Sequence, residues 1–200
     1  MNTFPLHNKS RAPRRQAGVF LVELSFTLMI FLIMVFTIIE VSRALYLWNT
    51  LQEVTRRAAR AAAVTNFKDE IAMNQLKREA IFDSQSGKLA FGKPITSKNI
   101  TIDYIALKDE PGGGLTQVPI PAGSLPGCPV RNRVLCTADA GNASCIRFVR
   151  ARICQEDTNC TQVPYPSLIP ALSLPMNLPF STTLVKAQSM GYVPGMAICG

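Results

Sequence analysis

Hydrophobic residues are distributed unevenly along this 200-residue chain, with one long apolar run near the N-terminus. The stretch from Leu24 to Ile39 contains sixteen residues without a charge, and the run as a whole extends from Gly18 to Ile39. These 22 residues are enough for a helix to cross a hydrocarbon core of ~30 Å, because a helix rises ~1.5 Å per residue. The pattern therefore predicts a transmembrane helix over residues 19–40.

The charges in front of the apolar run predict its direction in the membrane. Four basic residues and no acid precede it: Lys9, Arg11, Arg14 and Arg15. Because positively charged flanks are retained on the cytoplasmic side, we expect the N-terminus to be cytoplasmic. Everything after residue 40 would then lie outside, which in a bacterium is the periplasm.

A cleaved secretory signal peptide and a twin-arginine signal are the alternatives to a retained anchor. Ser42 and Ala44 are small residues at signal-peptidase spacing, and Arg14-Arg15 is an arginine pair. However, the run is longer than a signal h-region of about 7–15 residues, and Glu40 and Arg43 crowd the cleavage site. The run is also too hydrophobic for a twin-arginine signal. The pattern favours a single-pass anchor that remains attached to the body.

An amphipathic pattern continues the helix beyond the membrane, to about Val64. No Gly or Pro occurs between Val19 and Ser86, so nothing interrupts a helix there. Apolar residues recur at spacings of three and four: Val41, Ala44, Leu45, Trp48, Leu51, Val54, Ala58 and Ala61. We expect this face to pack, with Trp48 as an interfacial anchor or a core contact. The opposite surface would be polar: Arg43, Gln52, Glu53, Arg56, Arg57 and Arg60.

A second amphipathic helix is predicted after Asp69, which is a typical N-cap residue. Its inward positions would be Ile71, Leu76, Ala80 and Ile81. Gly87 fits the C-terminal stop of this helix.

The rest of the chain reads as a small sheet with proline-rich connections. Strands are predicted at residues 98–107, from Cys145 and from Phe180, with residues 111–129 as a long loop or hairpin. The apolar segment 163–179 is broken by prolines, so it covers a sheet edge or offers a partner surface. The predicted fold is α+β, with an antiparallel sheet of three to four strands. Its organisation would be a basic leader (1–18), a transmembrane helix (19–40), a periplasmic extension of that helix (41–66) and a small periplasmic α+β domain (67–200).

Cysteine usage points to an oxidising compartment. All six cysteines follow residue 127: Cys128, Cys136, Cys145, Cys154, Cys160 and Cys199. An even number confined to one segment predicts disulfides. The spacing leaves all fifteen pairings open.

Composition argues against catalysis, metal binding and nucleic-acid binding. His7, in the leader, is the only histidine, and the sequence has no CxxC pair, so we expect no catalytic residues, no metal site and no cofactor. The net charge is +8, but without the four leader residues 17 basic face 13 acidic residues, which is +4. That is too little for a nucleic-acid surface. Arg147, Arg150 and Arg152 fit a solvated, partly paired face better than an acid-binding one.

Glu23 lies inside the apolar run, where a carboxylate is costly. It is either a tolerated acid near the membrane boundary or part of a built interaction. If the chain were cut after Gly18, Val19 would carry a new cationic amine and Glu23 would be the fifth residue. Between parallel, staggered helices the amine of one chain would neutralise the carboxylate of the next. Glu23 would then set the register of an assembly.

A basic leader, a glycine and a glutamate five residues later, here Lys9 to Gly18 and then VFLVE, resemble the type IV pilin group. More narrowly, the chain resembles the TadE-like family of pilin-related proteins. The matching elements are the apolar helix that begins GVFLVE, the IIEVSRALY element of residues 38–46 and the TRRAARAAA tail. The order of strand, proline-rich segment and last strand over 145–193 is also similar. Val19 and Leu24 depart from the residues usual in pilins.

The resemblance implies a pilin-like fold and a minor pilin, or pseudopilin, of a tight-adherence (Flp-type) pilus. A prepilin peptidase would cut between Gly18 and Val19, and Glu23 would act in the cut and in helix registration. The implied partners are that peptidase, inner-membrane platform proteins, other minor pilins, the major Flp pilin and membrane lipid. The implied location is the bacterial inner membrane or the pilus.

Two rival readings of the sequence remain beside the pilin resemblance. The first is a membrane-anchored periplasmic binding protein that is never cleaved. This hypothesis explains the same sequence features as the pilin hypothesis, but in it Gly18 and Glu23 have no role in cleavage or assembly. The second is an anchored periplasmic hydrolase, which the lack of any histidine after His7 disfavours. We therefore expect a protein that is not an enzyme.

Overall fold

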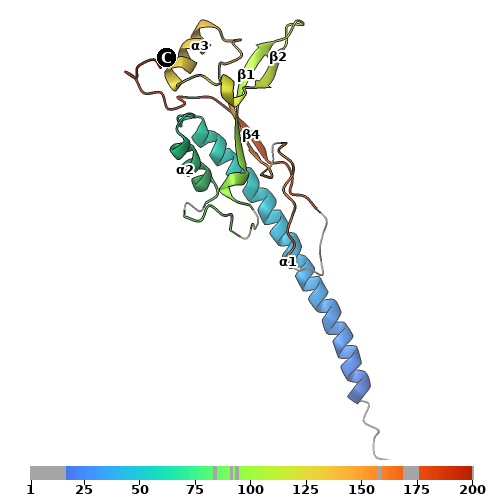
Figure 1. Cartoon of the computed structure of the whole chain (residues 1–200). Helices are drawn as coiled ribbons and strands as arrows, with labels where there is room; N and C mark the ends of the chain where they lie inside the picture. The colour runs from blue at the N-terminus through green and yellow to red at the C-terminus, as the bar shows by residue number, and fades with distance from the viewer. Residues whose placement is uncertain are drawn as a thin grey trace, which may run out of the picture. The chain divides into compact units, whose positions relative to one another are not determined.

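The computed structural model of the chain describes residues 17–82, 85–90, 92, 95–156, 159–168 and 176–199 (Figure 1). The chain divides into two compact units, Met1–Ile39 and Glu40–Gly200. Helix α1 (Ala17–Ala62) contributes its first part to the first unit and its second part to the second.

The described part of the first unit is a single helical segment whose apolar side chains face outward. From Val19 to Ile39 the large hydrophobic residues are exposed or, at Val35, half-buried. The most apolar window of α1 has none of its residues buried, and its length and composition are those of a membrane-spanning helix. Exposed apolar area of this extent is unfavourable in water, so this surface needs a lipid or protein environment.

The second unit is built on a four-stranded antiparallel sheet with the order β2-β1-β3-β4. Its strands are β1 (Ile100–Asp109), β2 (Leu115–Pro119), β3 (Phe148–Ile153) and β4 (Thr182–Lys186). The register pairs Ile102 with Ala151 and Val149 with Val185, which puts apolar residues of neighbouring strands on one face. The predicted α+β fold and sheet are thus confirmed.

The core of this unit lies between the second part of α1 and the sheet. Leu47, Leu51 and Val54 are fully buried in one cluster with Ile100 and Ala151. Hydroxyl groups join the same helix to the last strand, because Thr55 Oγ1 lies 3.0 Å from Ser181 Oγ and 2.9 Å from Thr183 Oγ1. The helix therefore contacts β4 through both packing and hydrogen bonds.

Helix α2 (Glu70–Ala80) begins where the sequence predicts and ends earlier. Asp69 caps it by accepting a hydrogen bond from the Ala72 amide at 3.0 Å. Leu76, Ala80 and Ile81 are buried as expected, but Ile71 is 80% exposed, so its assignment to the core was wrong. Gly87 does not end the helix either. The chain turns at Phe82, which takes the left-handed conformation with φ +67°, and Gly87 lies in the next turn.

Residues 111–138 contain two elements that the sequence did not define. The expected loop or hairpin is a hairpin, in which β2 pairs with β1. Gly113, with φ +82°, lies in the turn between the two strands. Helix α3 (Pro129–Ala138) was not predicted. The short 3₁₀ helices η1 (Ser97–Asn99) and η2 (Ala122–Ser124) precede β1 and follow β2.

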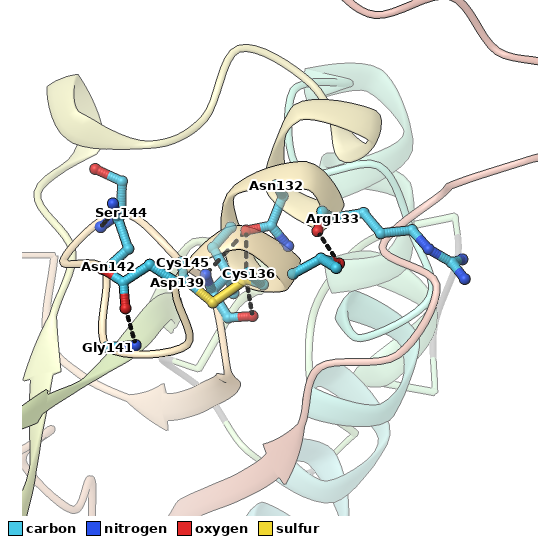
Figure 2. The surroundings of a disulfide bond; sticks show 10 residues. Asn132, Arg133, Cys136, Asp139, Gly141, Asn142, Ser144 and Cys145 are labelled. Carbon is cyan, nitrogen blue, oxygen red and sulfur yellow. Dashed lines mark hydrogen bonds between the residues drawn. A yellow bond between two sulfur atoms is a disulfide. The ribbon is translucent and has the colours of Figure 1, made fainter.

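All six cysteines are paired, as Cys128–Cys199, Cys136–Cys145 and Cys154–Cys160. The first joins α3 to the C-terminal segment across 71 residues. The second joins α3 to the segment before β3 (Figure 2). The first two bonds therefore tie α3 to the C-terminal segment and to the segment that leads into β3.

Candidate functional site: the apolar helix and its two glutamates

The predicted processing segment lies at the start of α1. Gly18, Val19 and Glu23 are all exposed, and the space around Gly18 is open. Three hydroxyl groups of the same helix donate hydrogen bonds to carbonyls of the preceding turn at 2.7–2.9 Å. They belong to Ser25, Thr27 and Thr37. Such bonds satisfy the polar groups of a helix in an apolar medium.

Glu23 differs from these hydroxyl-bearing residues. It is the only charged residue between positions 17 and 39. Among the residues that the structure describes, no ion pair involves its carboxylate. A carboxylate on an exposed apolar helix would need a partner from outside the chain if that helix lay in an apolar medium. The basic residues Lys9, Arg11, Arg14 and Arg15 lie outside the described residues.

The second glutamate of the helix, Glu40, has the opposite environment. Its side chain is 1% exposed and belongs to a buried cluster with Arg43 and Tyr165, which we call the Glu40 cluster. The Tyr165 hydroxyl donates to Glu40 Oε1 at 2.6 Å, and the Leu168 amide donates to both carboxylate oxygens at 3.3 Å. Arg43 Nη1 lies 3.6 Å from Glu40 Oε1.

Arg43 completes the Glu40 cluster. Its Nη1 donates to the Pro166 carbonyl at 2.6 Å and to the Tyr165 hydroxyl at 3.1 Å. Its guanidinium also lies 5.2 Å from the centre of the Tyr165 ring. Burial, together with the hydrogen bond to Glu40, raises the pKa of the Tyr165 phenol above its usual range. The Glu40 cluster thus fastens the start of the proline-rich segment to α1.

This arrangement corrects the sequence interpretation of Arg43. We expected Arg43 on the polar surface of the helix, but it is buried with Glu40. The error arose because periodicity assigns charged residues to the solvent side, whereas paired charges can be buried when their hydrogen bonds are satisfied. Residues 38–46, the IIEVSRALY element, supply both charged members of the cluster. Their partner Tyr165 lies more than a hundred residues away, where the sequence gives no signal of pairing.

The predicted packing face of α1 is reproduced only in its second half. Leu51, Val54 and Ala58 are fully buried, and Ala61 is half-buried. Leu45 is exposed and Trp48 is 38% exposed, because the buried stripe passes through Ala44 and Leu47. In the first half of this face, apolar residues also occupy the neighbouring positions, so the periodicity did not determine which of them face the core. Within this unit Leu45 and Trp48 are surface residues, available to lipid or to another protein.

The three arginines around β3 have different surroundings. Arg150 and Arg152 bind the same carboxylate oxygen of Asp103, at 3.0 and 2.8 Å. Their charges are therefore partly neutralised, as expected for a paired face. Arg147 lies at the other end of the strand and lines a groove beside α3. In the described part of the chain, no cluster of three metal-ligating side chains occurs.

A long exposed apolar helix joined to a disulfide-bonded α+β unit suggests a membrane-anchored protein. Residues 18–60 match the family model described as TadE-like protein, so over this helix the chain is similar to that family. The family is one of structural pilus components and is not a known enzyme family. Comparisons with curated proteins and with solved structures gave no match.

Proposed function

We propose that this protein is a minor pilin, or pseudopilin, of a tight-adherence (Flp-type) pilus, and that a prepilin peptidase cuts it after Gly18. The observation that carries the proposal is the TadE-like match, which begins at Gly18 and includes Val19 and Glu23. In the resemblance to type IV pilins, Gly18 and Val19 flank the cleavage site and Glu23 acts in the cut and in helix registration.

The exposed apolar surface of α1 supports this role. Apart from Glu23, the surface over residues 19–39 is largely apolar, and it suits two environments in turn, membrane lipid and then the helices of other pilins. Before assembly, lipid covers it. In an assembly, neighbouring helices of other minor pilins and of the major Flp pilin would cover it.

Glu23 supports the proposal because it lacks a partner within the described chain. After cleavage, the Val19 amine of one subunit would neutralise the Glu23 carboxylate of the next. A charge pair that satisfies both ions in an apolar surrounding fixes one axial stagger and disfavours the others.

The proposed topology follows from the charges at the helix ends. The leader (1–18) with Lys9, Arg11, Arg14 and Arg15 stays in the cytoplasm, where the peptidase acts, and residues 19–40 span the inner membrane. The helical extension (41–66) and the domain 67–200 lie in the periplasm, where the three disulfides are stable. Inner-membrane platform proteins would contact the anchored form.

The role of Glu23 is tested by Glu23→Ala in a strain whose own copy of the gene is deleted. We expect the variant to reach the membrane fraction at the wild-type level and to lose pilus assembly. Glu53→Ala is the matched control, because Glu53 is an acid on the same helix outside the apolar run. Membrane fractionation checks insertion, and surface pili are counted by electron microscopy. Normal pili in the Glu23→Ala strain would mean that Glu23 is only a tolerated acid.

A further inference from the structure

A groove beside α3 collects positive charge that no described acid neutralises. It has a volume of about 320 Å³ and is lined by residues from α3, from the start of β3 and from the end of β4. Its basic side chains are Arg133, Arg147 and Lys186. None of the described residues that line it is acidic. Arg150 and Arg152, on β3 just after Arg147, show the contrast, because both bind Asp103.

The walls of this cationic groove are held in place before any ligand binds. The disulfide Cys136–Cys145 joins α3 to the segment before β3 (Figure 2). The buried Asn132 side chain accepts a hydrogen bond from the Ile146 amide at 2.9 Å. The Arg147 backbone bonds to Ile105 on one side and to Ala187 on the other, each at 2.9 Å. A site that is already ordered loses little entropy when it binds.

Arg133 is also positioned by its neighbours. Its guanidinium lies 4.7 Å from the centre of the Tyr192 ring. Figure 2 shows its side chain extending from α3 away from the disulfide. A stacked guanidinium keeps its donor groups at the ring edge free for a carboxylate.

A more apolar groove along α3 adjoins the cationic one. It has a volume of about 450 Å³ and includes Val130, Val134 and Ala138. Arg133, Thr137 and Tyr192 line both grooves, so the two lie next to each other. Val134 is 50% exposed, although it is a large apolar side chain. A ligand that fills both must therefore carry negative charges beside apolar groups.

We propose that this composite groove binds an acidic segment of a partner protein, in which carboxylates alternate with apolar side chains. The carboxylates would bind Arg133, Arg147 and Lys186, while an apolar side chain would pack on Val134. The charge of the groove matches an anion, and the apolar shelf distinguishes a peptide from inorganic phosphate. The proposal does not depend on pilus assembly, because it rests on the second unit alone.

The test is a fluorescence-anisotropy titration of the full chain in zwitterionic detergent micelles. The probe is a short labelled peptide of alternating glutamate and leucine, and its glutamine–leucine counterpart is the neutral comparison. We expect the acidic peptide to bind and the neutral one not to. Arg147→Gln with Lys186→Gln should raise the dissociation constant about three- to tenfold, since it removes two partly exposed charge pairs.

The control for lost positive charge is Arg131→Gln with Lys98→Gln, which removes two exposed charges outside the groove. It should leave the dissociation constant within about twofold of the wild type. Val134→Ser should weaken the binding of the acidic peptide, because it removes the apolar contact. Near-ultraviolet circular dichroism confirms that each variant is folded.

Three results would overturn the proposal. The first is no binding of the acidic peptide. The second is an equal loss of affinity in the control variant, which would mean that the overall charge attracts the peptide. The third is displacement of the peptide by inorganic phosphate, or by vesicles containing phosphatidylglycerol, at comparable concentrations. That result would identify a small-anion or lipid site instead.

Discussion

Glu23 and Glu40 lie on the same helix and satisfy their charge in different ways. Glu40 has its partners within the chain, because Tyr165, Arg43 and the Leu168 amide surround it. Glu23 is exposed and has no ion-pair partner among the described residues. A buried carboxylate with all its bonds made contributes to a fixed structure. A carboxylate without them is suited to an intermolecular contact.

Glu40→Ala should destabilise the second unit by about 3–5 kcal/mol, because it leaves the Arg43 charge buried without its carboxylate. Glu53→Ala is the control. It breaks an exposed pair with Arg57 on the same helix and should cost no more than ~0.5 kcal/mol. Urea unfolding in micelles, followed by circular dichroism, measures both. Equal stability of the two variants would contradict a structural role for the Glu40 cluster.

Tyr104 predicts how stability depends on alkaline pH. Burial raises the pKa of this phenol above its ordinary value near 10, so the unfolded chain loses the proton first. Above pH ~10 the folded state then holds more protons than the unfolded state, and the free energy of unfolding falls as the pH rises. Below that pH the contribution is fully present.

Tyr104→Phe should therefore flatten the decline in stability above pH ~10 by about 1.4 kcal/mol per pH unit. At pH 7 it should cost little, because the hydroxyl donates only a weak hydrogen bond, to the Met73 sulfur at 3.8 Å, within the described residues. Urea unfolding at a series of pH values compares the variant with the wild type. Parallel pH profiles would show that Tyr104 titrates normally.

At the scale of elements, the sequence predicted the helices and strands that are determined by local patterns of residues. The apolar run and the absence of Gly and Pro defined α1, alternation defined β1, and β3 and β4 were also expected from the sequence. Helix α3 was missed because its sequence, PVRNRVLCTA, has no apolar stripe. The interactions that hold α3 in place are non-local. They are the hydrogen bond from the Ile146 amide to the Asn132 side chain and two disulfides. The Glu40 cluster was missed for the same reason, since Tyr165 is distant in sequence.

The three disulfides should differ in their contribution according to the length of chain they close. Cys128–Cys199 spans 71 residues and Cys154–Cys160 spans 6. In the chain-entropy account, replacing the first pair by serine should cost about 4 kcal/mol and replacing the second about 2 kcal/mol. Unfolding in urea without reductant gives both values. A larger loss from the short pair would show that contacts of the native state outweigh loop entropy here.

At the scale of the whole molecule, the two units have different requirements. The first presents apolar side chains that need lipid or other helices, and the second has its own core and three disulfides. The TadE-like match falls on the helix shared by both, at residues 18–60. The proposed function accounts for this division, because the helix assembles while the second unit offers its surface to partners.

The mass of the mature N-terminus tests the central claim most directly. The protein is purified from host membranes with an active prepilin peptidase, and its intact mass is determined, with a peptidase-deficient strain as the control. The account predicts a chain that begins at Val19 in the first strain, with or without a methyl group on its amine, and a retained leader in the second. A chain that still carries residues 1–18 in the first strain would contradict the pseudopilin account and favour an uncleaved anchor.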